Sequence, residues 1–121
     1  MPVRYVFIVR HGERADRAPE TRSEYKNHAD APLTMRGHDQ ATESGFYLQE
    51  EIRRVVQCEG CSFEEVNIKS SPFARCISSA NQIASVLGIK KIDIDYSYGE
   101  WLAKWLYREN PIPFLERIKH F

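Results

Sequence analysis

The chain has 121 residues and no internal repeat, which favours a single domain, and its 42% apolar and 28% charged residues are ordinary for a globular protein. Its 17 basic and 17 acidic side chains balance, so no net field attracts the chain to nucleic acid or to an anionic membrane. The apolar runs are too short to span a membrane. Because the chain starts directly with a predicted strand, no signal peptide is expected. Three cysteines, an odd number, favour a reducing, cytoplasmic location.

The N-terminal region combines an apolar run with a long charged loop. Residues 3–9 are almost continuously apolar, which predicts a strand covered on both faces of a sheet. Residues 12–32 follow with many charges and little periodicity, and a loop of that length in a compact domain is usually functional or mobile.

The first helix is predicted to begin at Leu33 and Thr34, with Thr34 as its N-cap, and to fade over residues 58–60. Small and apolar residues recur within it at spacings of three and four, the period of a helix with one buried face. That stripe consists of Ala41, Gly45, Leu48, Ile52 and Val55.

Residues 65–69 are predicted to form a second strand, with Val66 and Ile68 on one face. A second helix should follow, with Ser71 as N-cap, Pro72 at the first helical position and Gly88 as C-terminal cap. The buried stripe expected on this helix consists of Ile77, Ala80, Ile83, Ala84 and Leu87.

Residues 92–95 alternate between apolar and polar and predict a third strand. An aromatic segment over residues 99–107 follows, and Pro111 and Pro113 separate it from a short final helix over residues 114–120. One stripe at helical spacing in this segment predicts a contact with the core or with a partner: Trp101, Leu102, Trp105 and Leu106.

Strands and helices therefore alternate along the chain, which predicts an α/β fold with three layers, α/β/α, around a mainly parallel sheet. Two common nucleotide sites are absent from the sequence. No G-x-G-x-x-G follows the first strand, and no G-x-x-x-x-G-K-[ST] occurs.

The pair Arg10 and His11 stands at the carboxyl end of the first predicted strand. Ligands bind at that end of the strands in open α/β sheets. An imidazole there can attack phosphorus, and a guanidinium with five N–H donors can hold the phosphoryl oxygens. The pair therefore indicates covalent phosphoryl chemistry.

Two further residues follow predicted strands at the same end of the sheet. Arg75 lies near the beginning of the second helix, where N–H groups and the helix dipole favour an anion, although an ordinary solvated arginine is the alternative. Glu100 follows the third strand beside Trp101, where an apolar neighbourhood would raise its pKa and suit a general acid. The alternative for Glu100 is a surface glutamate in a turn.

Four stretches in this order resemble the histidine phosphatase superfamily, also called the phosphoglycerate mutase-like fold. They are Arg10-His11-Gly12-Glu13, residues 33–41 with the pattern L-T-x-x-G-x-x-Q-A, residues 71–75 with S-P-x-x-R, and the segment around Glu100. Details such as Arg14 with a following Asp, Arg75-Cys76 and Glu100-Trp101 look like the ecdysteroid-phosphate phosphatase and suppressor of T-cell receptor signalling branch.

This resemblance implies that His11 is the phosphorylated nucleophile, that Arg10, Arg14 and Arg75 bind phosphate, and that Glu100 is the acid. It implies a phosphatase without a metal or organic cofactor. The substrate would be a phosphorylated small molecule or a phosphoprotein, with tyrosine phosphates and small alcohol phosphates both open. Phosphoglycerate mutase activity fits these details less well.

The chain departs from the family pattern in one respect. The family completes its phosphate pocket with a second histidine on a later strand, and the remaining histidines here, His28, His38 and His120, follow no apolar strand. Each is interpreted as a solvated side chain. Residues 1–121 are therefore expected to be the N-terminal portion of a single histidine phosphatase domain, either as a fragment of a longer protein or as a truncated member of the family.

The truncated fold would expose a sheet edge, which a second copy or a larger assembly would cover. The alternative function is a catalytically inactive phosphatase-like subunit, or a phosphate-binding or structural module. Cys58 and Cys61 form half of a zinc motif without its partner pair, so no metal site is expected.

Overall fold

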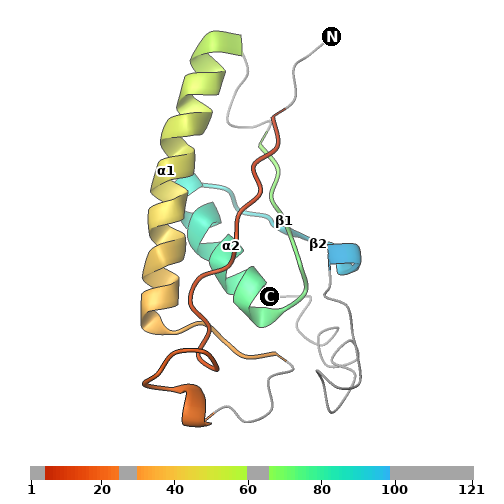
Figure 1. Ribbon diagram of the computed structural model, residues 1–121. Helices are drawn as coiled ribbons and strands as arrows, with labels where there is room; N and C mark the ends of the chain where they lie inside the picture. Colours follow the sequence, from red (N-terminus) through yellow and green to blue (C-terminus); the bar gives the residue numbers. More distant parts are fainter. Residues whose placement is uncertain (1–4, 25–29, 60–65, 99–121) are drawn as a thin grey trace.

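The computed structural model describes residues 5–24, 30–59 and 66–98. Its described regular elements are helices α1 (Met35–Glu59) and α2 (Ala74–Leu87), strands β1 (Lys69–Ser70) and β2 (Asp93–Ile94), and the 3-10 turns η1 (Arg22–Glu24) and η3 (Tyr96–Tyr98) (Figure 1). This is an α/β arrangement. The aromatic segment and the final helix predicted after residue 98 lie outside the described residues.

Helix α1 begins and ends where the sequence predicts. The Thr34 hydroxyl accepts a hydrogen bond from the Gly37 N–H at 2.9 Å, the contact of an N-cap with the third helical residue, and the helix ends at Glu59. The predicted stripe faces inward, with Val55 half-buried and the other four residues buried. Neither described helix is apolar enough over sufficient length to cross a membrane.

Helix α2 starts later than predicted. Its N-cap is Phe73, with extended backbone (φ −67°, ψ 143°), so Ser71 is not the cap and Pro72 is not the first helical residue. The Ser71 hydroxyl accepts only a long 3.5 Å hydrogen bond from the Phe73 N–H. The other end follows the prediction, because Gly88 adopts the left-handed conformation (φ 73°) that suits glycine.

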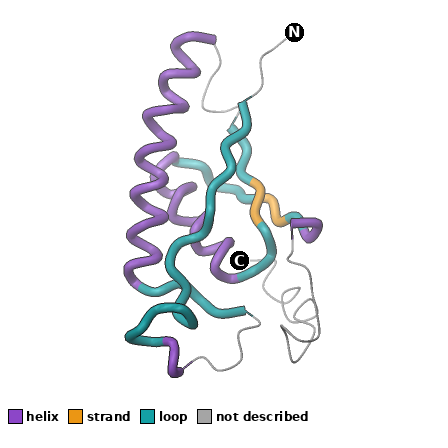
Figure 2. Tube along the Cα trace, in the orientation of Figure 1, coloured by secondary structure: helices purple, strands orange, loops and turns teal. Residues whose placement is uncertain are grey.

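The core lies between the two helices and the extended segment that leads into β1. Leu48 and Ile52 of α1 meet Ile83 of α2, and four half-buried residues pack against them: Val56, Val66, Ile68 and Leu87. Gly45 allows the helices to approach closely, since a Cβ there would lie 3.0 Å from the Val86 Cβ. In Figure 2 the two purple helices, α1 and α2, lie side by side, and teal loops connect them to the short orange strands.

Strands β1 and β2 pair in parallel, as the alternation of strands and helices predicts. The Asp93 N–H donates to the Ile68 carbonyl at 3.0 Å, and the Asp95 N–H donates to the Ser70 carbonyl at 2.9 Å. Both strands are shorter than predicted, but Val66 and Ile68 share the core-facing side as expected.

The predicted first strand is wrong for the part that the structure describes. Residues 5–9 are loop rather than strand, and they form the first part of the red segment, next to the N-terminal end of the trace in Figure 1. On one side of the run Val6 is 84% exposed and Ile8 is 94% exposed, and on the other side Tyr5, Phe7 and Val9 are 42–48% exposed, so neither side is buried. An apolar run becomes a buried strand only where neighbours cover it, and a local sequence pattern carries no information about those neighbours.

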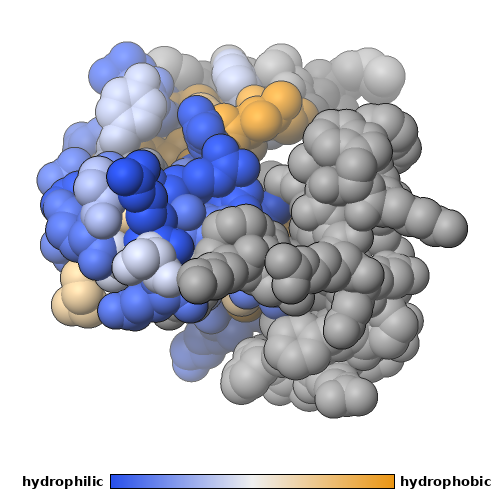
Figure 3. Space-filling view, turned by 60° about the horizontal axis from the view of Figure 1, so that its bottom comes forward, coloured by the Kyte–Doolittle hydropathy of each residue, from blue (hydrophilic) through white to orange (hydrophobic). Residues whose placement is uncertain are grey.

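The long loop is ordered at its base. Its two ends pair in antiparallel fashion: the Ala15 N–H donates to the Pro32 carbonyl at 2.8 Å, and the Thr34 N–H donates to the Glu13 carbonyl at 3.0 Å. Within the loop, Ala15 and Ala18 are buried. Polar side chains cover most of the coloured surface in the view from this end of the molecule (Figure 3).

Candidate active site

His11 follows the exposed apolar run and is itself half-buried. Its Nδ1 lies 2.7 Å from the carbonyl oxygen of Gly12. A carbonyl can only accept a hydrogen bond, so Nδ1 carries the proton. The neutral ring therefore has its lone pair on Nε2, which is the atom available for attack on an electrophile.

The electrostatic surroundings of His11 favour its neutral form. Burial lowers the pKa of His11 below its ordinary value, and the guanidinium charges of Arg75, Arg14 and Arg10 lower it further, against the opposing effect of the hydrogen bond to Gly12. The structure thus brings all three arginines singled out in the sequence within electrostatic range of His11.

Ser79 connects the His11 segment to helix α2. Its hydroxyl accepts a hydrogen bond from the Gly12 N–H at 3.0 Å and donates one to the Arg75 carbonyl at 2.8 Å. Arg75 is only 1% exposed, and its guanidinium carbon lies 4.3 Å from the centre of the Phe73 ring. The interpretation of Arg75 as a solvated arginine is therefore wrong.

Arg14 lies in a defined ion pair. Its Nε donates to one carboxylate oxygen of Asp16 at 2.8 Å, and its Nη2 donates to the other at 2.6 Å. The sequence singled out Arg14 as a phosphate ligand without giving Asp16 a role. The only local signal was an acidic residue two positions after the arginine.

Asp30 is a second acidic residue that sequence reasoning missed. Its carboxylate accepts a hydrogen bond from the Ala74 N–H at 2.7 Å and thereby takes up an N–H that the sequence argument left open to a bound anion. Burial raises the pKa of Asp30, while this hydrogen bond and the charges of Arg75 and Arg14 oppose the rise. The charges of Arg75 and Arg14 therefore act on both Asp30 and His11.

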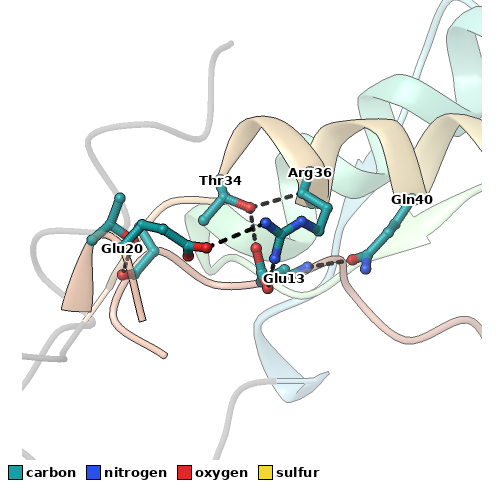
Figure 4. A network of polar contacts seen from close by, with 8 residues as sticks. Glu13, Glu20, Thr34, Arg36 and Gln40 are labelled. Atoms are coloured by element: carbon teal, nitrogen blue, oxygen red, sulfur yellow. Dashed lines mark hydrogen bonds and ion pairs between the residues drawn. The ribbon is translucent and has the colours of Figure 1, made fainter. Parts of the chain in front are cut away.

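Glu13 fixes the beginning of α1 against the His11 segment (Figure 4). Its carboxylate accepts hydrogen bonds from the Thr34 hydroxyl at 2.8 Å and from Arg36 Nη1 at 3.0 Å. Its N–H donates to the side-chain oxygen of Gln40 at 2.8 Å. Two fixed residues of the L-T-x-x-G-x-x-Q-A pattern, Thr34 and Gln40, and Arg36 at one of its variable positions therefore hold Glu13.

The backbones of this junction touch. A Cβ at Gly12 would lie 2.1 Å from the Gly37 carbonyl oxygen, and a Cβ at Gly37 would lie 2.4 Å from the Glu13 carbonyl oxygen. Both glycines are therefore required by close approach rather than by an unusual backbone angle.

The remaining predicted residues lie partly outside the described chain. Glu100, the acid candidate, lies outside the described residues, as do Cys61, His28 and His120. His38 is half-buried on α1, with its Nδ1 3.3 Å from the Gln82 side-chain nitrogen, so it is not a simple solvated side chain. The described part of the chain holds no group of three His, Cys, Asp or Glu that could bind a metal ion.

Comparison with known proteins identifies one matching protein family. No curated protein matches the chain, and no solved structure matches it. The family model described as histidine phosphatase superfamily (branch 1) matches residues 6–105, a span that contains His11 and the three arginines around it as well as Glu100. The chain belongs to the histidine phosphatase superfamily.

Proposed function

We propose that the chain is a phosphomonoester hydrolase that works through a phosphohistidine at His11. Membership of the family suggests activity of the phosphatase or mutase type. The observation that carries the proposal is the 2.7 Å contact of His11 Nδ1 with the Gly12 carbonyl, because it leaves Nε2 as a nucleophile among three guanidinium groups.

The reaction has two steps. The Nε2 lone pair of His11 forms a bond to phosphorus while the bond from phosphorus to the ester oxygen breaks, and the proposed acid Glu100 gives a proton to the departing oxygen. Water then attacks phosphorus and gives a proton to the Glu100 carboxylate. The bond from Nε2 to phosphorus breaks, and inorganic phosphate leaves.

Arg10, Arg14 and Arg75 are assigned to the phosphoryl oxygens. Guanidinium groups fixed in place before the reaction stabilise the charge that develops on those oxygens. We also propose that the chain is similar to the ecdysteroid-phosphate phosphatase and suppressor of T-cell receptor signalling branch, and that its fold has three layers. The proposed substrate is a small phosphate ester or a phosphoprotein.

The test is turnover and trapping with the whole chain. With para-nitrophenyl phosphate as substrate, His11→Ala should lower kcat by roughly 10³ or more, because loss of the nucleophile removes the covalent route. A phosphoryl group that is stable to alkali and labile to acid should accumulate on the wild-type chain and not on the variant.

The control is His38→Ala, which removes a histidine that contacts Gln82 on the helix pair. It should retain both turnover and the trapped phosphoryl group. Equal turnover by His11→Ala and the wild-type chain would contradict the nucleophile assignment.

A second candidate is a phosphate-binding module without catalysis. His38, the other histidine that the structure describes, contacts Gln82, and no further histidine has been assigned to the phosphate site. Binding of inorganic phosphate by the wild-type chain, with neither turnover nor a trapped phosphoryl group, would favour this candidate.

A further inference from the structure

The Arg14 and Asp16 pair has a definite geometry. Asp16 accepts from Nε and Nη2, so the carboxylate lies along one side of the guanidinium plane. An arginine has five N–H donors, and this contact uses two of them. The end of the guanidinium, formed by Nη1 and the second N–H of Nη2, is left outside the contact.

The backbone explains why the carboxylate reaches back to Arg14. The N–H groups of Arg17 and Ala18 both donate to the Arg14 carbonyl at 3.1 Å, which closes a tight turn around Asp16. The Ala15 N–H is held by Pro32 on the opposite side of the loop. The turn is therefore fixed at both ends, and the position of the carboxylate is fixed with it.

Burial makes separation of the two charges energetically unfavourable. The Asp16 side chain is 0% exposed and that of Arg14 is 12% exposed. A buried carboxylate without a cation is strongly unfavourable, so the two side chains hold each other in one arrangement. Exposed ion pairs in the same region, such as Arg36 with Glu20 at 3.5 Å, carry no such constraint.

We infer that Asp16 is a positioning residue that holds the end of the Arg14 guanidinium toward the phosphoryl group bound beside His11. The inference rests on the proposed function and deepens it. Asp16 itself does not touch the substrate. It fixes the direction of Arg14, whose charge acts on His11. The Arg14 side chain therefore loses less conformational entropy when phosphate binds.

The test is Asp16→Asn in the whole chain, with inorganic phosphate as the probe and para-nitrophenyl phosphate as the substrate. An asparagine offers one acceptor and places an N–H group against the second arginine donor, so the two-point contact is lost. Loss of one hydrogen bond to a charged group corresponds to about a tenfold increase in a dissociation constant. We expect the Kd of phosphate and the KM to rise by about that factor, and kcat to fall less.

A double-mutant cycle separates positioning from a general structural effect. In an Arg14→Met background, Asp16→Asn should leave the Kd of phosphate unchanged, since there is no guanidinium left to hold. Glu20→Gln is the matched control, because Glu20 lies in the same loop as Asp16 and its exposed carboxylate pairs with Arg36 of α1. It should leave both Kd and KM at their wild-type values.

A folded Asp16→Asn chain with wild-type phosphate affinity would overturn the inference, and so would an equal loss of affinity in the Arg14→Met background. If Asp16→Asn does not fold, Asp16→Glu keeps the charge but shifts the guanidinium, and unchanged affinity in that variant overturns the inference equally. A wild-type chain that binds no phosphate and hydrolyses no ester would overturn the proposed function, and the inference with it.

Discussion

At the scale of single residues, the proposed chemistry depends on which nitrogen of His11 carries a proton. The Gly12 carbonyl fixes that proton on Nδ1, and burial together with three positive charges disfavours a second proton on Nε2. A protonated imidazole has no lone pair with which to attack phosphorus. The arginines that are proposed to bind phosphate therefore also favour the neutral, nucleophilic form of His11.

The titration of His11 tests this directly. Because its folded-state pKa is lowered below the ordinary 6.5, the imidazole should still be mostly neutral at pH 6.5, and the midpoint of its protonation should lie at lower pH. The unfolded chain binds that proton first, so His11 contributes stability above pH 6.5 that is lost as the pH falls through its folded-state pKa. NMR titration of the His11 ring protons without substrate measures the pKa, and a midpoint above 6.5 would contradict the assignment.

At the scale of elements, the course of α1 and the parallel pair of short strands were predictable, whereas the first strand and the beginning of α2 were not. Thr34 and the stripe from Ala41 to Val55 lie within one stretch of chain, so the local pattern determines where α1 begins and which face it buries. The beginning of α2 was misplaced because the Ala74 N–H is taken up by Asp30, 44 residues away, and no local cap indicates such a partner. The exposed residues 5–9 show the same dependence on distant neighbours.

In the candidate site, too, residues marked by the local sequence pattern were predicted, and residues whose contacts are distant in sequence were missed. His11 and Arg75 were found because each follows an apolar run at the same edge of the predicted sheet, and the structure places Arg75 within electrostatic range of His11. Asp30 and Ser79 were missed because their contacts join distant segments of the chain. Acidic residues and serines are too common for their identity alone to mark a site.

The junction of α1 with the His11 segment gives a prediction at this scale. Alanine in place of glycine within a helix normally stabilises it by about 1 kcal/mol. At Gly37 the new Cβ would lie 2.4 Å from the Glu13 carbonyl oxygen, so the backbones must separate. We expect Gly37→Ala to lower the free energy of unfolding by about 1–3 kcal/mol, the range of overpacked sites.

Urea denaturation of Gly37→Ala measures this change, and Glu43→Ala is the control. Glu43 is an exposed residue in the interior of the same helix, where substitution should change stability by no more than about 0.5 kcal/mol. An increase in stability for Gly37→Ala would mean that the close contact is absent in solution.

At the scale of the whole molecule, apolar side chains are unevenly distributed. The described core lies between α1 and α2, where Leu48, Ile52 and Ile83 meet, while Val6 and Ile8 lie largely outside it. The proposed nucleophile therefore follows directly on an exposed segment, and its position depends on contacts made after it, through Gly12, Glu13 and Ser79. The stability of this part of the chain should come from the helix pair rather than from the apolar run.

Two identical substitutions in different surroundings test this distribution. Ile83 is 7% exposed and Ile8 is 94% exposed, so the same loss of side-chain atoms removes buried contacts at one site and almost none at the other. Ile83→Ala should lower the free energy of unfolding by about 2–5 kcal/mol, and Ile8→Ala should lower it by less than about 0.5 kcal/mol. Denaturant unfolding of the two variants beside the wild-type chain measures both values. Equal losses at the two positions would mean that residues 5–9 are buried in solution, as the original strand prediction requires, and that the exposed arrangement of this segment is wrong.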